Sequence, residues 1–216
     1  MKILKYFLEF IFIFLLFLIF KIIGYRMASN FSSTIVGLIG PFFRSKERII
    51  SNIRKSLKDI NQEDAQKIAN EMWKNYGRIL AEYVFIKKFR NSEFDKFLDI
   101  DGLEILNEIK KNKEPVVFIS GHFNNFELMA MQIEKSGVNL AAIYRPLNNI
   151  FLNKLMEKIR KKYICKNQIK KGRAGTRELL HYFKNGHSVA LMIDQRVSEG
   201  IKSDFFRRQA FTTTIP

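Results

Sequence analysis

Short apolar runs alternate with amphipathic segments between residues 115 and 193, and this alternation constrains the fold more than any other feature of the chain. The apolar runs predict buried strands, and spacings of three and four between apolar residues predict helices. The strands are expected at 115–120, 140–144 and 188–193, and the helices at 125–135, 150–162 and 176–184. Strands that alternate with helices favour an α/β fold with a mostly parallel sheet flanked by helices, whose functional loops gather at the carboxyl ends of the strands.

The chain is long enough for one substantial domain. It has 216 residues, of which 47% are hydrophobic and only 4 are proline, so it can bury a core. A further long helix is predicted from Asn61, which can cap it, to about Tyr83. The single cysteine, Cys165, excludes an internal disulfide framework and is expected to be a passive thiol.

The N-terminal segment is apolar enough to enter a membrane. Residues 6–23 are apolar apart from Glu9 and Lys21. As a helix they would reach about 27 Å, just short of the ~30 Å hydrocarbon core, so a short transmembrane helix or a membrane-embedded anchor is expected. A signal peptide and a core helix are the alternatives. No A-x-A-like cleavage site follows the apolar run, which disfavours the signal peptide.

The flanking residues predict the orientation and the organisation of the chain. More basic residues follow the apolar run than precede it, so by the positive-inside rule the bulk of the protein is expected to be cytoplasmic. A second apolar stretch, at 31–43, is interrupted by glycines and is expected to lie in the membrane interface. We therefore expect a membrane anchor or interfacial segment at 1–43 and the main domain at 44–216.

The charge of the chain is strongly positive. It has 37 Lys and Arg against 21 Asp and Glu, a formal net charge of +16, and the run from Lys158 to Arg177 holds nine basic residues and no acid. This surplus favours an anionic partner, although a compositional bias toward lysine would also raise the count. Nucleic acid is disfavoured, because the apolar leader would tether the chain to lipid and no known nucleic-acid-reading motif is present.

His122 and Glu127 stand where the first predicted strand ends. Gly121 permits a tight bend before His122, and Glu127 falls in the first turn of the next helix. Side chains five residues apart on one helix would diverge by about 140°, so the two can meet only if His122 precedes the helix. A carboxylate bonded to one imidazole nitrogen strengthens the other nitrogen as a base. On spacing alone, a loop histidine beside an ordinary first-turn glutamate stays the alternative.

The other titratable candidates have simpler explanations. His181 and His187 flank a predicted helix end and are expected to be structural or solvated. No H-E-x-x-H motif or dense cluster of ligands accompanies His122, so no metal is expected.

Several short motifs follow one another along the chain in an order that is typical of a known protein family. Gly121, His122, Asn125 and Glu127 form a G-H-x-x-N-x-E pattern. The other blocks are Asn52, Gly77-Arg78, Glu82, Tyr144-Arg145-Pro146, Asp194-Gln195, Asp204-Phe205-Phe206 and Ala210-Phe211-Thr212. Over its whole length the chain resembles the bacterial lipid A biosynthesis acyltransferase family, the late acyltransferases within the lysophospholipid-acyltransferase superfamily.

The resemblance implies an O-acyltransferase at the cell inner membrane, with its domain at 44–216 on the cytoplasmic side. It would move a fatty acyl chain from an acyl-carrier-protein thioester to a hydroxyl of a phosphorylated glucosamine lipid, with no further cofactor. His122 would act as the general base and Glu127 would hold the imidazole. The expected substrate-binding residues are Asn125, Arg145, Asp194 and Gln195. The expected partners are the acyl-carrier protein, an anionic glycolipid or phospholipid acceptor, and the membrane.

Two departures from the family pattern bear on these expectations. Arg207 stands where the family usually has glycine, so a different local turn is expected there. The sequence ends at Pro216, so the C-terminal part of the family fold is expected to be missing. These departures leave a catalytically inactive, truncated membrane-surface binding protein as one alternative. A lysophospholipid or aminolipid acyltransferase is the other, because the catalytic motif does not distinguish between these acceptors.

Overall fold

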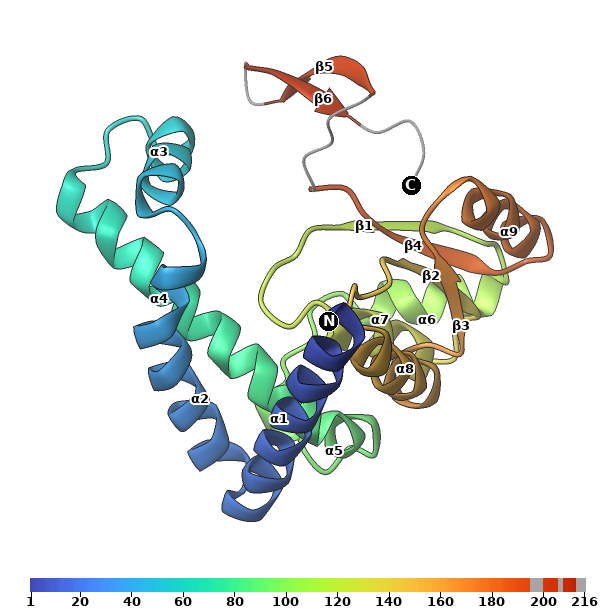
Figure 1. Ribbon diagram of the computed structural model, residues 1–216. Coiled ribbons are helices and arrows are strands. Elements are labelled where there is room, and N and C mark those ends of the chain that lie inside the picture. Colours follow the sequence, from blue (N-terminus) through green and yellow to red (C-terminus); the bar gives the residue numbers. More distant parts are fainter. Residues whose placement is uncertain (195–199, 206–207, 213–216) are drawn as a thin grey trace. The chain divides into compact units, whose positions relative to one another are not determined.

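The structure is a computed structural model that describes residues 1–194, 200–205 and 208–212 (Figure 1). The chain forms two compact units. The first, here called the sheet unit, comprises Met1–Phe10 and Ile86–Pro216, and the second, the helical unit, comprises Ile11–Phe85. The boundary between residues 43 and 44 falls inside the helical unit, and the division of the chain by function at that point stays a prediction.

A four-stranded sheet forms the centre of the sheet unit. Its strands are β1 (Val117–Ser120), β2 (Leu140–Tyr144), β3 (Asn167–Lys170) and β4 (Ser188–Met192). They pair in the order β1-β4-β2-β3, and every pairing is parallel. The α/β fold with a parallel sheet is therefore confirmed. The sequence did not indicate β3, because Ile169 is its only apolar residue.

Helices precede and connect the strands, and those that connect them cover both faces of the sheet. They are α5 (Ile86–Arg90), the 3₁₀ turn η3 (Asp95–Phe97), α6 (Leu103–Asn112), α7 (Glu127–Lys135), α8 (Ile150–Ile159), its π-helical continuation η4 (Arg160–Ile164) and α9 (Arg173–Lys184). The crossovers through α7 and α8 both move along the sheet toward β3, whereas the crossover through α9 returns to β4. Because such crossovers are right-handed, α7 and α8 cover one face and α9 the opposite face.

Close packing of α9 requires a glycine. The buried core beneath this helix consists of Ala141, Ile169, Leu179 and Val189. A Cβ on Gly175 would lie only 1.9 Å from the main-chain oxygen of Lys170 at the end of β3. Gly175 therefore lets α9 approach the sheet closely enough to bury this core.

The helical unit contains the rest of α1, three further α-helices and two 3₁₀ turns. Its elements are α1 (Lys2–Ile23, shared with the sheet unit), α2 (Tyr25–Ile39), η1 (Gly40–Phe43), α3 (Lys46–Ser56), α4 (Gln62–Glu82) and η2 (Tyr83–Phe85). The predicted cap of α4 is confirmed, because Asn61 Oδ1 accepts a 2.8 Å hydrogen bond from the Asp64 N–H. Helices α2 and α4 pack closely, and a Cβ on Gly77 would lie 2.3 Å from the Ser32 main-chain oxygen.

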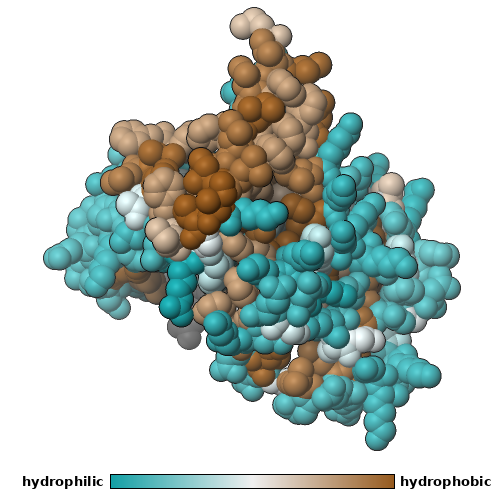
Figure 2. Space-filling view, turned by 90° about the horizontal axis from the view of Figure 1, so that it is seen from below, coloured by the Kyte–Doolittle hydropathy of each residue, from teal (hydrophilic) through white to brown (hydrophobic). Residues whose placement is uncertain are grey.

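Helix α1 has the length and composition to cross a membrane, and among the described residues no other helix does. Only Phe20 of this helix is buried. Figure 2 shows hydrophobic side chains gathered over one part of the face that it draws, beside a largely hydrophilic remainder.

A two-stranded antiparallel sheet lies near the C-terminal end of the described residues. Its strands are β5 (Ile201–Phe205) and β6 (Arg208–Thr212). The expected change of turn at Arg207 lies outside the described residues.

Candidate active site

Three residues singled out from the sequence follow neighbouring strands of the sheet. His122 follows β1, Asp194 follows β4 and Arg145 follows β2. Since β4 pairs with both β1 and β2, and all three strands are parallel, the three residues lie at one edge of the sheet. Strands β1 and β2 are roughly 10 Å apart at two strand spacings, a distance that one substrate can bridge.

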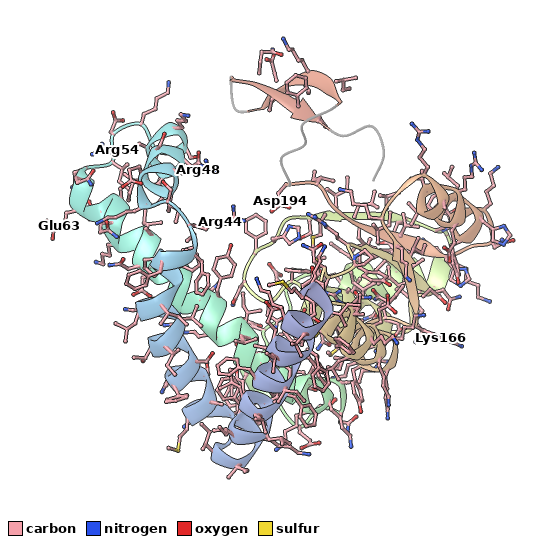
Figure 3. All side chains as sticks on the ribbon, viewed as in Figure 1. Arg44, Arg48, Arg54, Glu63, Lys166 and Asp194 are labelled. Carbon is pink, nitrogen blue, oxygen red and sulfur yellow. The ribbon has the colours of Figure 1, made fainter. Side chains whose placement is uncertain are left out.

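His122 and Asp194 form a hydrogen-bonded pair at this edge, and Figure 3 shows Asp194 at the end of β4. The His122 main-chain N–H donates to Asp194 Oδ2 over 2.7 Å, and His122 Nδ1 lies 2.6 Å from Asp194 Oδ1. Both carboxylate oxygens thus hold the same residue, once through its backbone and once through its ring. The two side chains are 33% and 40% exposed, so a substrate can reach them.

The protonation of this pair follows from its hydrogen bonds. Desolvation by burial pushes the pKa of Asp194 upward, but the hydrogen bonds from His122 outweigh it and hold the pKa below its ordinary value. The carboxylate is therefore ionised at neutral pH and can only accept hydrogen bonds. In the neutral imidazole Nδ1 must carry the proton, which makes Nε2 the basic nitrogen.

The loop between β1 and α7 fits this geometry. A Cβ on Gly121 would lie 2.9 Å from the ring of Phe123 and 3.1 Å from Asp194 Oδ2, so any larger residue would displace the carboxylate. Asn124 has φ = 44°, a left-handed conformation that asparagine tolerates better than most residues. The ring of Phe126 packs edge-on against His122, with the ring centroids 4.6 Å apart.

Glu127 begins α7 and forms a buried ion pair. Its Oε1 accepts hydrogen bonds from Arg160 Nε at 2.8 Å and Nη2 at 2.5 Å. The side chains are only 8% and 11% exposed. The sequence did not indicate Arg160 as a partner, because it lies in a basic run that resembles a solvated surface. The predicted support of His122 by Glu127 stays a prediction.

A second group of polar side chains lies next to this ion pair. The Tyr144 hydroxyl donates to Glu157 Oε1, and the Arg160 guanidinium lies over the Tyr144 ring, 5.6 Å from its centroid. Burial, followed by the neighbouring Glu157 carboxylate, raises the pKa of Tyr144, which keeps its hydroxyl protonated. Tyr144 ends β2 and Glu157 lies in α8, 13 residues further on, so no helical or strand spacing in the sequence indicates this contact.

The other predicted site residues have different surroundings. Asn125 is buried, with 7% of its surface exposed, and Arg145 is exposed. Gln195 lies outside the described residues. The substrate-binding roles of Asn125, Arg145, Asp194 and Gln195 stay predictions, and the contact between Asp194 and His122 is one that the sequence did not indicate. Residues 1–194, 200–205 and 208–212 contain no group of three or more His, Cys, Asp or Glu side chains that could hold a metal ion.

Fold and site define an α/β protein with a histidine–carboxylate pair at the carboxyl edge of a parallel sheet, an arrangement suited to general-base chemistry. The chain belongs to the bacterial lipid A biosynthesis acyltransferase family, whose model matches residues 1–216.

Two curated relatives illustrate the similarity. The lipid A biosynthesis palmitoleoyltransferase of Escherichia coli K12 is 26% identical over 168 residues, which is 76% of this chain and 53% of the relative. The lipid A biosynthesis myristoyltransferase of the same organism is 21% identical over 119 residues, 55% of this chain and 37% of the relative. The chain thus spans about half the length of the palmitoleoyltransferase and a smaller part of the myristoyltransferase.

Proposed function

We propose that this protein is an acyltransferase of lipid A biosynthesis that moves a fatty acyl chain from an acyl-carrier-protein thioester to a hydroxyl of a phosphorylated glucosamine lipid. The observation that carries the proposal is the pairing of His122 Nδ1 with Asp194 Oδ1 at 2.6 Å, in a chain of this family. Acyl transfer from a thioester needs a base for the alcohol proton and does not need an enzyme nucleophile, because the thioester is already activated.

In the proposed reaction, His122 Nε2 takes the proton from the acceptor hydroxyl. The oxygen attacks the thioester carbonyl and forms a tetrahedral oxyanion. Collapse of this intermediate forms the new ester, breaks the carbon–sulfur bond and expels the carrier-protein thiolate, which takes the proton from His122. Asp194 keeps the imidazole in the tautomer with a basic Nε2, and its negative charge stabilises the imidazolium. Glu127 gives further support, as the family resemblance implies.

The surrounding residues have supporting roles in this proposal. The exposed Arg145 follows β2 at the same edge of the sheet, where it would bind an acceptor phosphate or stabilise the oxyanion. Asn125 and Gln195 would help to position the substrate. The reaction needs no cofactor beyond the acyl donor. The enzyme would work at the inner membrane, with the site on the cytoplasmic side.

The proposal is tested by acyl transfer in membranes that carry the chain, with labelled acyl-carrier protein as the donor. His122→Ala should lower kcat by about 10²–10⁴-fold, because the general base is lost. Asp194→Asn should also lower kcat with little change in KM, because an amide at this position can donate to Nδ1 and stabilise the wrong tautomer. His181→Ala is the matched control, since His181 is exposed and lies on α9. Unchanged transfer by both site variants would refute the mechanism.

A panel of acceptors decides between the possible substrates. Transfer to a lysophospholipid or an aminolipid, but not to the glucosamine lipid, would place the chain with another acceptor class. If the folded chain binds vesicles and transfers acyl groups to none of these acceptors, it is an inactive membrane-surface protein and the proposal fails.

A further inference from the structure

A buried asparagine connects the start of α1 to the rest of the sheet unit. Asn149 precedes α8 and is 6% exposed. Its Oδ1 accepts hydrogen bonds from the Phe151 and Leu152 N–H groups at 3.1 and 3.2 Å. Its Nδ2 donates to the Tyr6 main-chain oxygen at 2.8 Å and to Glu9 Oε2 at 3.0 Å. One side chain thus caps α8 and binds α1, and it uses all of its hydrogen-bonding capacity to do so.

Charge and aromatic packing strengthen this connection. Glu9 is the only acidic residue of α1, and Asn149 holds its carboxylate beside the N-terminus of α8, where the helix dipole favours a negative charge. The ring of Phe151 packs against Phe7 and Phe10, with centroid distances of 5.6 and 6.0 Å. The first turns of α1 are therefore docked on the sheet unit by polar and apolar contacts together.

This docking limits how far α1 can enter a bilayer. Helix α1 ends at Ile23, so the part beyond the docked turns, Ile11–Ile23, is about 20 Å long at 1.5 Å per residue. The hydrocarbon core of a bilayer is ~30 Å thick. The segment Ile11–Ile23 alone is too short to cross it, and the full helix can do so only if the contacts of Asn149 break.

The exposed residues of α1 fit a helix that enters lipid without crossing it. Large apolar side chains are exposed along its whole length, including Ile3 at 67%, Leu8 at 59%, Phe12 at 67% and Ile22 at 84%. Lys2 and Lys5 are exposed at its beginning. Apolar side chains can therefore insert among acyl chains while the two lysines remain at the head groups.

We propose that α1 is a one-sided anchor: it enters the lipid from the side of the membrane on which the sheet unit lies, and its N-terminus stays on that side. The proposal rests on the membrane location in the proposed function, but not on the acyl-transfer chemistry.

Thiol labelling of sealed membrane vesicles tests the proposal in the full chain. The only native thiol, that of Cys165, is buried, and this desolvation raises its pKa to about 12, so it stays protonated and unreactive. Single cysteines are introduced as Lys2→Cys at the N-terminus and, as a reference, Lys162→Cys on the surface of the sheet unit. A membrane-impermeant maleimide is then applied to vesicles of known orientation.

We expect the reagent to label both positions from the same side of the membrane. Labelling from opposite sides would show that α1 spans the bilayer and would overturn the inference, while acyl transfer could still proceed as proposed. Release of the chain from the vesicles by a high-salt wash would show that it is not anchored in the lipid, and would also overturn it. Acyl transfer measured on the same vesicles keeps a failure of the chemistry distinct from a failure of the anchor.

The connecting contact is tested by Asn149→Asp. Aspartate still caps α8, but it cannot donate to Tyr6 and it repels Glu9. We expect faster hydrogen–deuterium exchange over residues 2–10 in this variant. Asn61→Asp is the matched control, because Asn61 caps α4 in the same way and lies in the helical unit. Equal exchange over residues 2–10 in Asn149→Asp and the unmodified chain would overturn the docking.

Discussion

At the scale of single residues, Arg160 differs from its neighbours in the basic run from Lys158 to Arg177. The other eight basic side chains of the run are exposed, whereas the Arg160 side chain is only 11% exposed and pairs with Glu127. An arginine withdrawn from water needs a matched charge and hydrogen-bond acceptors, and the Glu127 carboxylate supplies the opposite charge and accepts from Nε and Nη2. The basic run in the sequence thus contributes both exposed charges at the surface and one arginine to an internal ion pair.

We expect Glu127→Ala to lower the free energy of unfolding by about 3–5 kcal/mol, because it leaves the Arg160 charge buried without this carboxylate. Urea denaturation measures the change. The control is Glu71→Ala, which removes an exposed partner of Lys74 and should leave stability almost unchanged.

Replacing both partners separates stability from catalysis. The double variant Glu127→Leu with Arg160→Met should regain much of the lost stability, because apolar side chains of similar volume can fill the space. If this stable variant still fails to transfer acyl groups, the polar residues themselves are needed for activity. If Glu127→Ala is as stable as the unmodified chain, the ion pair between Glu127 and Arg160 does not contribute to stability as expected.

At the scale of elements, glycines set how closely helices approach their neighbours. Gly77 of α4 faces the backbone of α2, and a Cβ there would lie 2.3 Å from the Ser32 oxygen and 2.7 Å from the Ser33 Cα. Gly37 of α2 faces α4 differently, since its Cβ would meet only the flexible Lys74 side chain, at 3.0 Å from Cγ.

We expect Gly77→Ala to destabilise the packing of α2 and α4 by about 1–3 kcal/mol, because backbone atoms cannot move aside as a side chain can. Gly37→Ala should be neutral or slightly stabilising, because alanine favours the helix and the lysine can shift. Thermal unfolding of the two variants measures both changes in stability. Equal changes would contradict the conclusion that Gly77 contacts backbone whereas Gly37 contacts only a flexible side chain.

The helices and strands also show which elements can be predicted from sequence patterns alone. Strand β2 was predicted at its observed bounds, 140–144, because it is a continuous apolar run. Strand β3 was missed because it is polar, and it becomes a strand only by pairing with β2. The predicted helix 150–162 is observed as α8 followed by the π-helical turn η4, a change of winding that apolar spacing does not reveal.

At the scale of the whole molecule, the excess charge has a location. Exposed lysines and arginines of the basic run follow one another along α8, η4, β3 and the start of α9, and Figure 3 shows Lys166 among them at the surface. Exposed basic side chains in this number attract acidic proteins at a distance and speed their association. This excess charge fits the acyl-carrier protein as the proposed donor.

We expect the triple variant Lys161→Glu, Lys162→Glu and Lys166→Glu to weaken binding of acyl-carrier protein by at least about 10-fold, since reversed charges repel an acidic partner. Calorimetry at low and at physiological salt measures the affinity. The matched control reverses Lys110, Lys111 and Lys113, which are exposed on and just after α6 and change the net charge equally. Equal loss in both triple variants would assign the effect to net charge instead of to this surface.

The sequence by itself determined the α/β class, three of the four strands of the parallel sheet, the apolar N-terminal helix and the histidine at the carboxyl end of β1. These follow from local patterns, because apolar runs, helical spacing and motif order lie within short stretches of chain. Only the tertiary structure decided which carboxylate holds Nδ1 of His122, since Asp194 is 72 residues away and reaches it through the pairing of β1 with β4. The same holds for Arg160 with Glu127 and for Asn149 with Glu9, because contacts between distant residues depend on how the elements pack and not on the residues beside them.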